Sequence, residues 1–447
     1  MSHTSPATVD LPPGPRWPQF AQDVAYVTKS RGLMRALNKR FGTVFSMRLR
    51  VFGSTVVISD PTLVKELFQQ PTVAVRGPDA NLGLILGPGS MFGLQGDEHR
   101  RHRKLLLPQF HGNRLRAYEG LIEKETLAET SLWPEGEEFP VLPSTMRITL
   151  NTILRAVFGA EGAEFDTLRT LMPRLVTVGS WLALLPWLHH DLGRWSPWGR
   201  FMAMRKELDD ILESLIAHAE ADPAFEQRKD VLSLMLQARY EDGTAMSHSD
   251  TGDELFSLIV AGHETTATSL AWAVERLRRH PKLLARLVEE VDASGSLLLQ
   301  ATVYELLRTR PVIDGAARQV VAPCISSGPW VIPRGYTVAV NIGLIHQNEA
   351  VYRDAAAFNP DRFLGVSPDT YSWVPFGGGT RRCPGAAFAN MEMMVVLRTI
   401  QREFRLVPTD APSERWRSRG VAFAPADGGR VLVYRRRDGA AVRRVRR

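Results

Sequence analysis

The sequence predicts a mainly α-helical protein with small β-sheets, and three features of the chain carry this prediction. Apolar residues recur every three or four positions over long stretches, which is the period of an amphipathic helix. Alternating, β-branched stretches are few and short, which is typical of minor sheets. No repeat, low-complexity linker or sharp change of composition divides the 447 residues. We therefore expect a single domain over residues 1–434, which begins with a proline-rich lead-in at residues 1–15.

The expected elements can be placed along the chain from this periodicity and from its Gly, Pro and Ser breaks. They are a hairpin at 44–58 that turns at Gly53 and Ser54, a mostly helical region at 114–236, one long helix at about 249–280, helices at 282–308 with a break at Ser294 and Gly295, short strands at 320–341 around Gly335, a helix at 385–404 and a strand at 430–434. The long helix ends where His280 and Pro281 follow, and its length indicates a helix that crosses the whole molecule.

The excess of positive charge is concentrated at the C-terminus. The chain has 55 Lys and Arg against 48 Asp and Glu, a net charge of +7. After Tyr434 the sequence RRRDGAAVRRVRR holds seven Arg and one Asp, which is +6 of that total. The rest of the chain is close to neutral, so we expect no nucleic-acid binding and a disordered basic tail over residues 435–447.

The cysteines and the apolar segments point to a soluble protein of a reducing compartment. The two cysteines, Cys324 and Cys383, are too few and too far apart for a disulfide framework. The polar N-terminus shows no signal peptide, so we expect a cytoplasmic protein. Residues 255–274 are long enough to span a membrane, but Glu264 near their centre would cost ~2.5–3.5 kcal/mol there. A buried helix is the better interpretation.

The most informative motif is a glycine-rich loop that contains one cysteine. It reads Phe376-Gly377-Gly378-Gly379-Thr380-Arg381-Arg382-Cys383-Pro384-Gly385. Glycines let the backbone turn tightly and approach a flat ligand closely. Pro384 is a favourable first helical residue, so Cys383 would lie at a helix N-terminus, where Arg381 and Arg382 would favour the metal-binding thiolate. The alternative is a buried cysteine that acts as a small apolar residue.

The fixed order Phe-x-x-Gly-x-Arg-x-Cys-x-Gly resembles the loop of the cytochrome P-450 family, the haem-thiolate monooxygenases. The resemblance implies the fold of that family, with the long helix at about 249–280 lying over the haem. It implies haem b as the cofactor and Cys383 as the axial ligand of its iron. Arg381 would pair with a haem propionate, while Phe376, Gly379 and Gly385 would surround the ligand.

A second motif lies within the long helix, where Ala261-Gly262 precede His263-Glu264-Thr265-Thr266. A glycine in mid-helix costs ~1 kcal/mol of helix stability against alanine, which suggests that it has a function. The alternative is a group of polar residues that are simply hydrogen-bonded within a buried helix. A zinc hydrolase is excluded because Ala267 stands where the second His of His-Glu-x-x-His belongs. The P-450 resemblance implies that Ala261 lies against the haem and that Thr265 and Glu264 serve oxygen activation and proton delivery.

Further matches to the family concern charged residues. Glu305, Arg308 and Arg362 match a structural ionic triad. His99, Arg103 and Arg318 match partners of the haem propionates. The neighbouring Arg100, Arg101 and Lys104 would then face outward on the thiolate side, as a positive patch for an acidic ferredoxin or flavodoxin-like electron donor.

The expected substrate is an apolar small molecule. By analogy with the family, the pocket is lined by Leu84, Leu86, Ile259, Val260, Val312, Ile313, Val421 and Phe423. A Trp-rich segment at 181–198 is either helix core or an access lip that meets lipid-like substrates or a membrane surface.

We therefore expect a monomeric monooxygenase that uses dioxygen and two electrons from separate proteins. No phosphate-binding loop, dinucleotide fingerprint or hydrolase elbow is present, so we expect no flavin or nicotinamide on this chain. Two alternatives stay open. One is a peroxygenase or isomerase with the same fold and no electron donor, and the other is a non-catalytic haem-binding or sensor protein.

Overall fold

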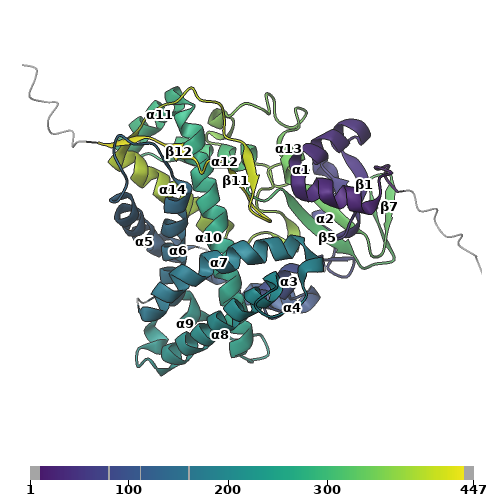
Figure 1. Ribbon diagram of the computed structural model, residues 1–447, viewed down its shortest axis with the longest axis horizontal. Coiled ribbons are helices and arrows are strands. Elements are labelled where there is room, and N and C mark those ends of the chain that lie inside the picture. The colour runs from purple at the N-terminus through teal and green to yellow at the C-terminus, as the bar shows by residue number, and fades with distance from the viewer. Residues whose placement is uncertain (1–10, 79–80, 111, 160–161, 437–447) are drawn as a thin grey trace, which may run out of the picture.

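The computed structural model describes residues 11–78, 81–110, 112–159 and 162–436. Its helices are α1 (Gln19–Phe41), α2 (Pro61–Phe68), α3 (Asn81–Leu86), α4 (Gly96–Leu106), α5 (Asn113–Thr130), α6 (Leu142–Phe158), α7 (Ala163–Leu184), α8 (Pro197–Ala221), α9 (Val231–Gln237), α10 (His248–Arg278), α11 (Pro281–Asp292), α12 (Leu297–Thr309), α13 (Ile342–His346) and α14 (Ala386–Glu403). The helices gather around α10, and the larger sheet lies with α1 at one side of the molecule (Figure 1).

The strands are short, as their sequences predict. They are β1 (Val44–Leu49), β2 (Gly53–Ile58), β3 (Val75–Arg76), β4 (Phe139–Pro140), β5 (Gly315–Val320), β6 (Cys324–Ser327), β7 (Trp330–Pro333), β8 (Thr337–Asn341), β9 (Phe404–Leu406), β10 (Trp416–Ser418), β11 (Phe423–Pro425), β12 (Arg430–Val431) and β13 (Val433–Arg435). One sheet has the order β1-β2-β8-β5-β3, and the other strands pair in twos. Among the paired strands of the described residues, only β2 and β8 run parallel. The prediction of a mainly helical single domain with small sheets is confirmed.

The long helix α10 is fixed at both ends by local signals. The Ser247 side chain caps its start by accepting from the backbone N–H of Asp250 at 3.0 Å. It ends at Arg278, close to the predicted boundary, because Pro281 starts the next helix. α10 packs against α6, α12, α14 and β11. The prediction of one long central helix is confirmed.

Two apolar cores meet along α10. Leu255, Phe256 and Ile259 belong to a core built with α6, α7, α8 and α9. Residues 270–274 and Leu277 belong to a second core built with α11, α12 and α14. The motif at 261–266 therefore lies at the junction between the two cores, where neither one fills all the space around the helix.

Three predicted details of the fold are wrong. The hairpin turns at residues 50–52, and Gly53 already pairs with Leu49 as the first residue of β2. The stretch 430–434 forms two short strands, because β12 pairs with β4 whereas β13 pairs with β9. The fold extends past Tyr434, since Arg435 lies in β13 and the Arg436 guanidinium pairs with Asp292 at 2.6 Å. The rest of the predicted tail, 437–447, lies outside the described residues.

The break at Ser294 and Gly295 is confirmed, because α11 ends at Asp292 and α12 begins at Leu297. Among the residues that the structure describes, no helix combines the length and the apolar character that crossing a membrane requires.

Candidate functional site

The loop that carries Cys383 is held in a tight conformation by its glycines. Gly377 and Gly379 have φ values of 65° and 61°, which favour glycine. A Cβ atom on Gly378 would lie 2.1 Å from the Phe68 ring, so no larger residue fits there. The Cys383 N–H donates to the Phe376 carbonyl at 2.9 Å and closes the loop.

The helix after this loop starts later than predicted. α14 begins at Ala386, and Pro384 and Gly385 form a turn before it. Cys383 therefore lies outside the first helical turn, and the prediction that Pro384 opens the helix is wrong.

The Cys383 thiol faces a partly enclosed space. Its residue exposes surface to solvent, yet enough protein surrounds the sulfur that burial raises its pKa. The Gly385 N–H, Arg103 and Arg382 act in the opposite direction and lower that pKa, but they do not outweigh burial. The predicted stabilisation of the thiolate is therefore wrong for the protein without a ligand. A metal ion bound to the sulfur would supply the missing stabilisation of the thiolate.

Four cationic or basic side chains converge beside this space, and we call them the cation ring: His99 and Arg103 of α4, Arg318 of β5, and Arg381. Burial, then repulsion by Arg103, lowers the pKa of Arg381 to about 10. Burial, then Arg381, lowers the pKa of Arg318 to about 10. Burial, then the nearby cations, lowers the pKa of His99 to about 3, so its ring is neutral near pH 7.

No carboxylate among the described residues pairs with any member of the cation ring. Arg381 donates to the carbonyls of Met91 and Leu94 and to Gln95 Oε1, the last at 2.6 Å. Arg318 donates to the Gly378 carbonyl at 2.6 Å. Because buried charges need a counter-charge, this excess of cations indicates a site for an anionic ligand.

The face of α10 at the junction of the two cores also has accessible surface. Val260, Ala261, Gly262 and Thr265 are half-buried, whereas nearly all other residues from 251 to 278 are buried. The Thr265 hydroxyl donates to the Ala261 carbonyl at 2.7 Å. A glycine here is open on one side, since a Cβ atom on Gly262 would meet only Ile153, at 3.3 Å.

These features fit haem on three counts. An accessible thiol can ligate iron, the unpaired cations suit two propionates, and the accessible face of α10 can lie along a flat macrocycle. Zinc does not fit, since no group of three or more His, Cys, Asp or Glu in the described part of the chain could hold a metal ion.

Glu264, predicted to act in proton delivery, is buried and paired. Its Oε1 accepts from Arg419 Nε at 2.7 Å. Arg419 follows β10 and lies 155 residues away along the chain. Burial, then Arg419, lowers the pKa of the adjacent His263 to about 4. His263 contacts Thr149 Oγ1 through Nδ1 at 3.1 Å and is neutral near pH 7.

The predicted ionic triad forms a second charged group, which we call the paired cluster: Glu305, Arg308 and Arg362. Arg308 Nε and Nη2 donate to the two Glu305 carboxylate oxygens at 2.7 and 2.8 Å. Arg362 Nε donates to Glu305 Oε1 at 3.2 Å. Both side chains of the Glu305–Arg308 pair are fully buried. The Glu305–Arg308 pair lies in the core with α12, and only Arg362 of the cluster has accessible surface, with a side chain 15% exposed.

The residues predicted to line a substrate pocket differ in how deeply they are buried. Phe423 N–H donates to the Val312 carbonyl at 2.9 Å, which brings these two segments together. Leu86, Ile259 and Val312 are buried, and Val260, Ile313, Val421 and Phe423 are half-buried. Leu84 is 58% exposed, so most of its side chain lies at the surface of the chain. Its helix α3 is short and turns this side chain outward.

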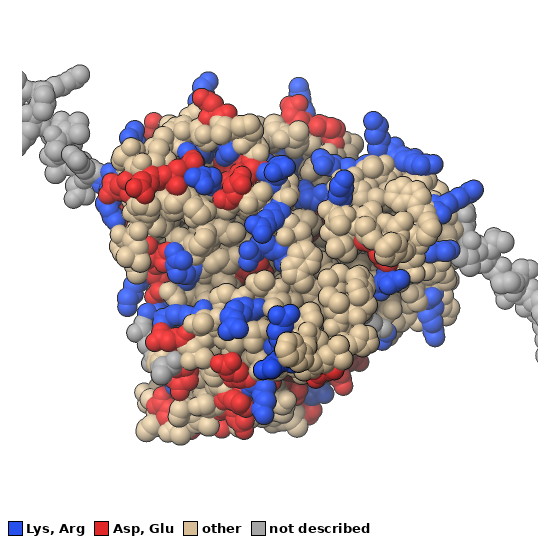
Figure 2. Space-filling view, viewed as in Figure 1, with Lys and Arg blue, Asp and Glu red and all other residues tan. Residues whose placement is uncertain are grey.

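The Trp-rich segment is divided between the two interpretations. Leu182 is buried, and Trp181 and Trp198 are half-buried, which agrees with helix core. Trp187, Leu192 and Trp195 are 41%, 68% and 78% exposed and lie in the connection between α7 and α8, which agrees with an accessible lip. On the face shown in Figure 2, a broad uncharged area lies to the right of centre, where α7 ends in Figure 1.

The predicted positive patch on α4 is neutralised by acidic partners. Arg100 pairs with Asp97 at 2.7 Å and Arg101 with Asp242 at 2.5 Å. Lys104 pairs with Glu241. The side chains point outward as expected, but the loop after α9 brings two carboxylates to them. The expectation of a net positive patch at these residues is therefore wrong.

Sequence reasoning did not find two residues that contact the site. Arg419 is one, and Glu254 of α10 is the other. A Glu254 oxygen accepts from the Met91 N–H at 2.7 Å and contacts His102 Nε2 at 3.2 Å. It thereby holds the loop whose Met91 carbonyl accepts from Arg381. No local pattern marks either residue, because each acts on partners that are more than 100 positions away.

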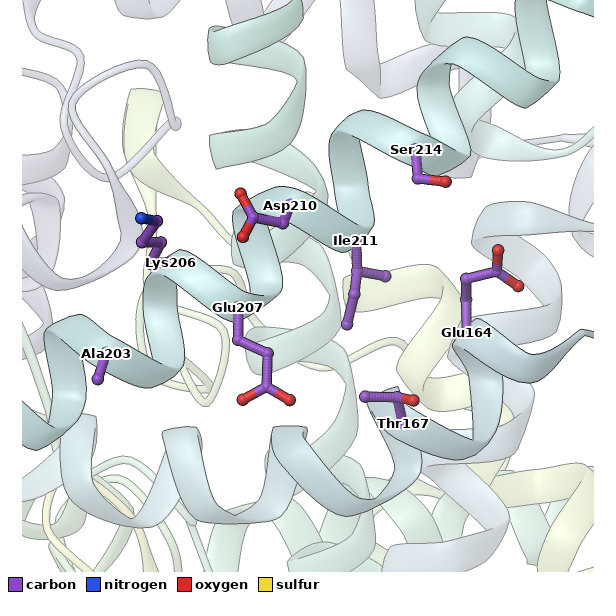
Figure 3. Close-up of a pocket in the computed structure, with 8 residues that line it drawn as sticks. All are labelled: Glu164, Thr167, Ala203, Lys206, Glu207, Asp210, Ile211 and Ser214. Atoms are coloured by element: carbon purple, nitrogen blue, oxygen red, sulfur yellow. The ribbon is translucent and has the colours of Figure 1, made fainter.

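A separate hollow of about 520 Å³ lies between α7 and α8 (Figure 3). Glu164 and Thr167 of α7 and Glu207 of α8 line it, together with Lys206, Asp210 and other α8 residues. In Figure 3, Glu207 points toward α7, whereas Lys206 and Asp210 lie on the other side of α8. None of the predicted site residues belongs to this hollow.

A thiol able to ligate iron, in a helical fold with an uncompensated group of cations beside it, defines the class of haem-thiolate proteins. The comparisons agree. The family model described as Cytochrome P450 matches residues 12–427. Cytochrome P450 138 of Mycobacterium tuberculosis is 51% identical over 432 residues, which is 97% of this chain and 98% of the relative. Cytochrome P450 135B1 of the same organism is 38% identical over 99% of this chain and 94% of the relative.

Solved structures show the same fold. The retinoic acid-bound cyanobacterial CYP120A1 matches with a TM-score of 0.85 and 22% identity over 96% of this chain and 100% of that chain. The cytochrome P450DA heme domain matches with a TM-score of 0.82 and 22% identity over 96% and 98%. The chain belongs to the cytochrome P450 family, the haem-thiolate monooxygenases, which bind haem and use dioxygen.

Proposed function

We propose that this monooxygenase inserts one oxygen atom of dioxygen into an apolar small molecule, with two electrons from separate ferredoxin or flavodoxin-like proteins. The balanced reaction converts R–H, O₂, two electrons and two protons into R–OH and water. The observation that carries the proposal is the cation ring beside the accessible Cys383 thiol. This arrangement suits haem, and it leaves Glu264 and Thr265 on the facing helix α10.

The residues of this chain have distinct roles in that reaction. When bound, haem supplies the iron that binds and reduces dioxygen. Cys383 would ligate that iron as the thiolate. The cation ring would hold the two propionates, while Phe376, Gly379, Gly385 and Ala261 would lie around the macrocycle. Thr265 presents its hydroxyl at the accessible face of α10, and Glu264 passes protons toward it.

Electrons would come from another protein, because the sequence carries no flavin or nicotinamide motif. The donor would approach on the side of the Cys383 loop. Arg382 is exposed there, next to the thiol ligand. Because Arg100, Arg101 and Lys104 are paired with acids, we assign the attraction of an acidic donor mainly to Arg382.

The substrate would enter past the accessible lip and reach the half-buried apolar residues Val260, Ile313, Val421 and Phe423. An apolar lining favours an apolar substrate. Trp187, Leu192 and Trp195 would meet a lipid-like substrate or a membrane surface before it enters. A cytoplasmic monomer remains our expectation for the chain.

Each of the two alternative functions differs from a monooxygenase in what it requires. A peroxygenase or isomerase needs no proton delivery to dioxygen, whereas this chain keeps a buried, ordered Glu264 beside Thr265. A non-catalytic haem protein would not consume reducing equivalents when substrate is added. Both differ from the monooxygenase in a measurable way.

The test uses the haem-loaded protein with surrogate redox partners and a panel of apolar substrates. We expect substrate-dependent NADPH consumption and hydroxylated product. Thr265→Ala should keep NADPH consumption but divert most of it to peroxide. Ser269→Ala is the matched control, because its hydroxyl makes the same kind of bond one helical turn later, to the Thr265 carbonyl at 3.0 Å. Equal coupling in Thr265→Ala and the native protein would remove Thr265 from the mechanism.

A further inference from the structure

The buried acid of α10 has an ionic partner that comes from a distant hairpin. Glu264 has a side chain only 6% exposed, and its carboxylate accepts from Arg419 Nε at 2.7 Å. The Arg419 side chain is 34% exposed, so the guanidinium joins the buried acid to accessible surface. Since burial and then Arg419 lower the pKa of His263, the guanidinium also lies near the preceding residue of α10.

The position of Arg419 is set by the turn between β10 and β11. The Arg419 N–H donates to the Ala422 carbonyl at 2.9 Å, which closes a tight turn. Gly420 in this turn has a φ of 93°, and a Cβ atom there would lie 2.6 Å from the Ser180 Cβ of α7. The backbone of the turn therefore packs directly against α7, and only glycine allows so close a contact.

The same turn carries residues of the predicted substrate lining. Val421 follows Gly420, and Phe423 begins β11. The Trp272 Nε1–H donates to the Phe423 carbonyl at 3.0 Å, which fastens the hairpin to α10 one to two turns beyond the motif. The hairpin thus contacts both α7 and α10, and Val421 lies between the two contacting residues in the sequence.

We propose that Arg419 is the positioning residue for Glu264: it holds the buried carboxylate at the turn between β10 and β11 and links it to solvent, so that the segment that contacts the substrate also sets the orientation of the acid. This inference rests on the proposed role of Glu264 in proton delivery. It assigns Arg419 no contact with the reacting atoms. A substrate that displaces Val421 or α7 would move the turn and, with it, the guanidinium that orients Glu264.

Loss of the guanidinium should affect the use of electrons more than the binding of substrate. In Arg419→Gln, Glu264 stays buried but loses its orienting partner and its link to solvent. We expect product formed per NADPH to fall about tenfold, a tenth of the smallest usual effect of losing a general acid or base. Substrate affinity should change less than twofold. Arg419→Lys, which keeps the charge, should recover part of the coupling.

The experiment is a double-mutant cycle on the haem-loaded protein, in which Arg419→Gln is made in the native and in the Glu264→Gln background. Arg417→Gln is the matched control, since Arg417 is an exposed residue of β10, the strand that leads into the turn. Hydrogen exchange of residues 418–423 and 178–184 gives a second readout that needs no turnover. We expect Arg419→Gln and Glu264→Gln each to speed exchange at the turn, and the double variant to add nothing further.

The outcomes separate this proposal from the proposed function. If Arg419→Gln lowers coupling in the native background and has no effect in Glu264→Gln, the inference holds. Equal losses in both backgrounds would show that Arg419 acts without Glu264, and no loss in either would show that it does not act at all. Both results overturn the inference. Unchanged coupling in Glu264→Gln alone would overturn the role of Glu264, and with it this inference.

Discussion

Two buried charged groups in this molecule contain similar residues but differ in how their charges are balanced. In the paired cluster, Arg308 and Arg362 both contact the Glu305 carboxylate, and further Arg308 donors reach the carbonyls of His346, Ala355 and Ala357. In the cation ring, Arg103, Arg318 and Arg381 lie near one another with no carboxylate among the described residues. The first group is complete in the chain itself, whereas the second is not.

The difference teaches which buried charges serve the fold and which serve a ligand. A buried ion pair whose donors and acceptors are satisfied stabilises one arrangement of its segments and has no capacity left for a ligand. Burial, and then repulsion between neighbouring cations, lowers the pKa values of Arg318 and Arg381, so these charges raise the free energy of the chain until an anion binds. The imbalance of the cation ring is therefore evidence for a dianionic ligand such as haem.

The largest effect is expected in the paired cluster. Arg308→Met leaves the Glu305 carboxylate buried beside only one remaining guanidinium. It should lower the free energy of unfolding by about 3–5 kcal/mol, the usual cost of breaking a buried pair. Arg286→Met is the control, because Arg286 pairs with Asp361 at the surface and should cost at most about 1 kcal/mol. Urea unfolding measures both. A cost in Arg308→Met no larger than that in the control would contradict the comparison.

A pH titration compares one histidine from each region. Burial lowers the pKa of both His99 and His346 to about 3, so each binds a proton in the unfolded chain below about pH 6.5 but not in the folded chain. The unfolded state then holds more protons, so stability falls as the pH drops from about 6.5 toward 3. In the haem-free protein, His99→Gln and His346→Gln should each remove about 1.4 kcal/mol per pH unit from that slope.

Haem should change this result for one histidine only. Propionates beside His99 would raise its pKa, so in the haem-loaded protein His99→Gln should alter the slope less. His346, whose Nε2 accepts from the Val374 N–H at 3.1 Å in the fully buried core, should behave alike in both states. An equal effect of His99→Gln with and without haem would place the propionates elsewhere.

The smallest expected change in stability comes from the cation ring, and it has the opposite sign. Arg103→Met removes a half-buried cation that pairs with no carboxylate among the described residues, so the haem-free chain should be about 1 kcal/mol more stable. The same variant should retain haem roughly tenfold less tightly, as is common when a supporting contact is lost. Haem transfer to apomyoglobin measures retention, with Arg100→Met as the exposed control. Destabilisation of the haem-free chain would show that Arg103 serves the fold.

The sequence predicted the features that depend on local pattern. The periodicity located α10 within a few residues, and the order of residues around Cys383 indicated the ligand loop. These predictions succeed because a helix and a motif are both encoded in neighbouring positions. The turn at residues 50–52 was placed too late because Gly53, whose φ is 71°, directly follows the turn and does not lie within it.

The features that depend on distant pairing could not be predicted. The acids that neutralise Arg101 and Lys104 come from residues 241 and 242, and the partner of Glu264 is Arg419. The pKa of Cys383 depends on how much protein encloses the sulfur, which helix-end rules do not include. Such contacts form only in the folded chain. The sequence around either partner alone carries no signal for them.

The most direct test of the central claim is the carbon monoxide difference spectrum of the reduced, haem-loaded protein. Iron ligated by the Cys383 thiolate gives the red-shifted band that distinguishes a thiolate from other axial ligands. We predict this band in the native protein and in Cys324→Ser, and its complete loss in Cys383→Ser. Absence of the band in the native protein, or its survival in Cys383→Ser, would contradict the assignment of the site.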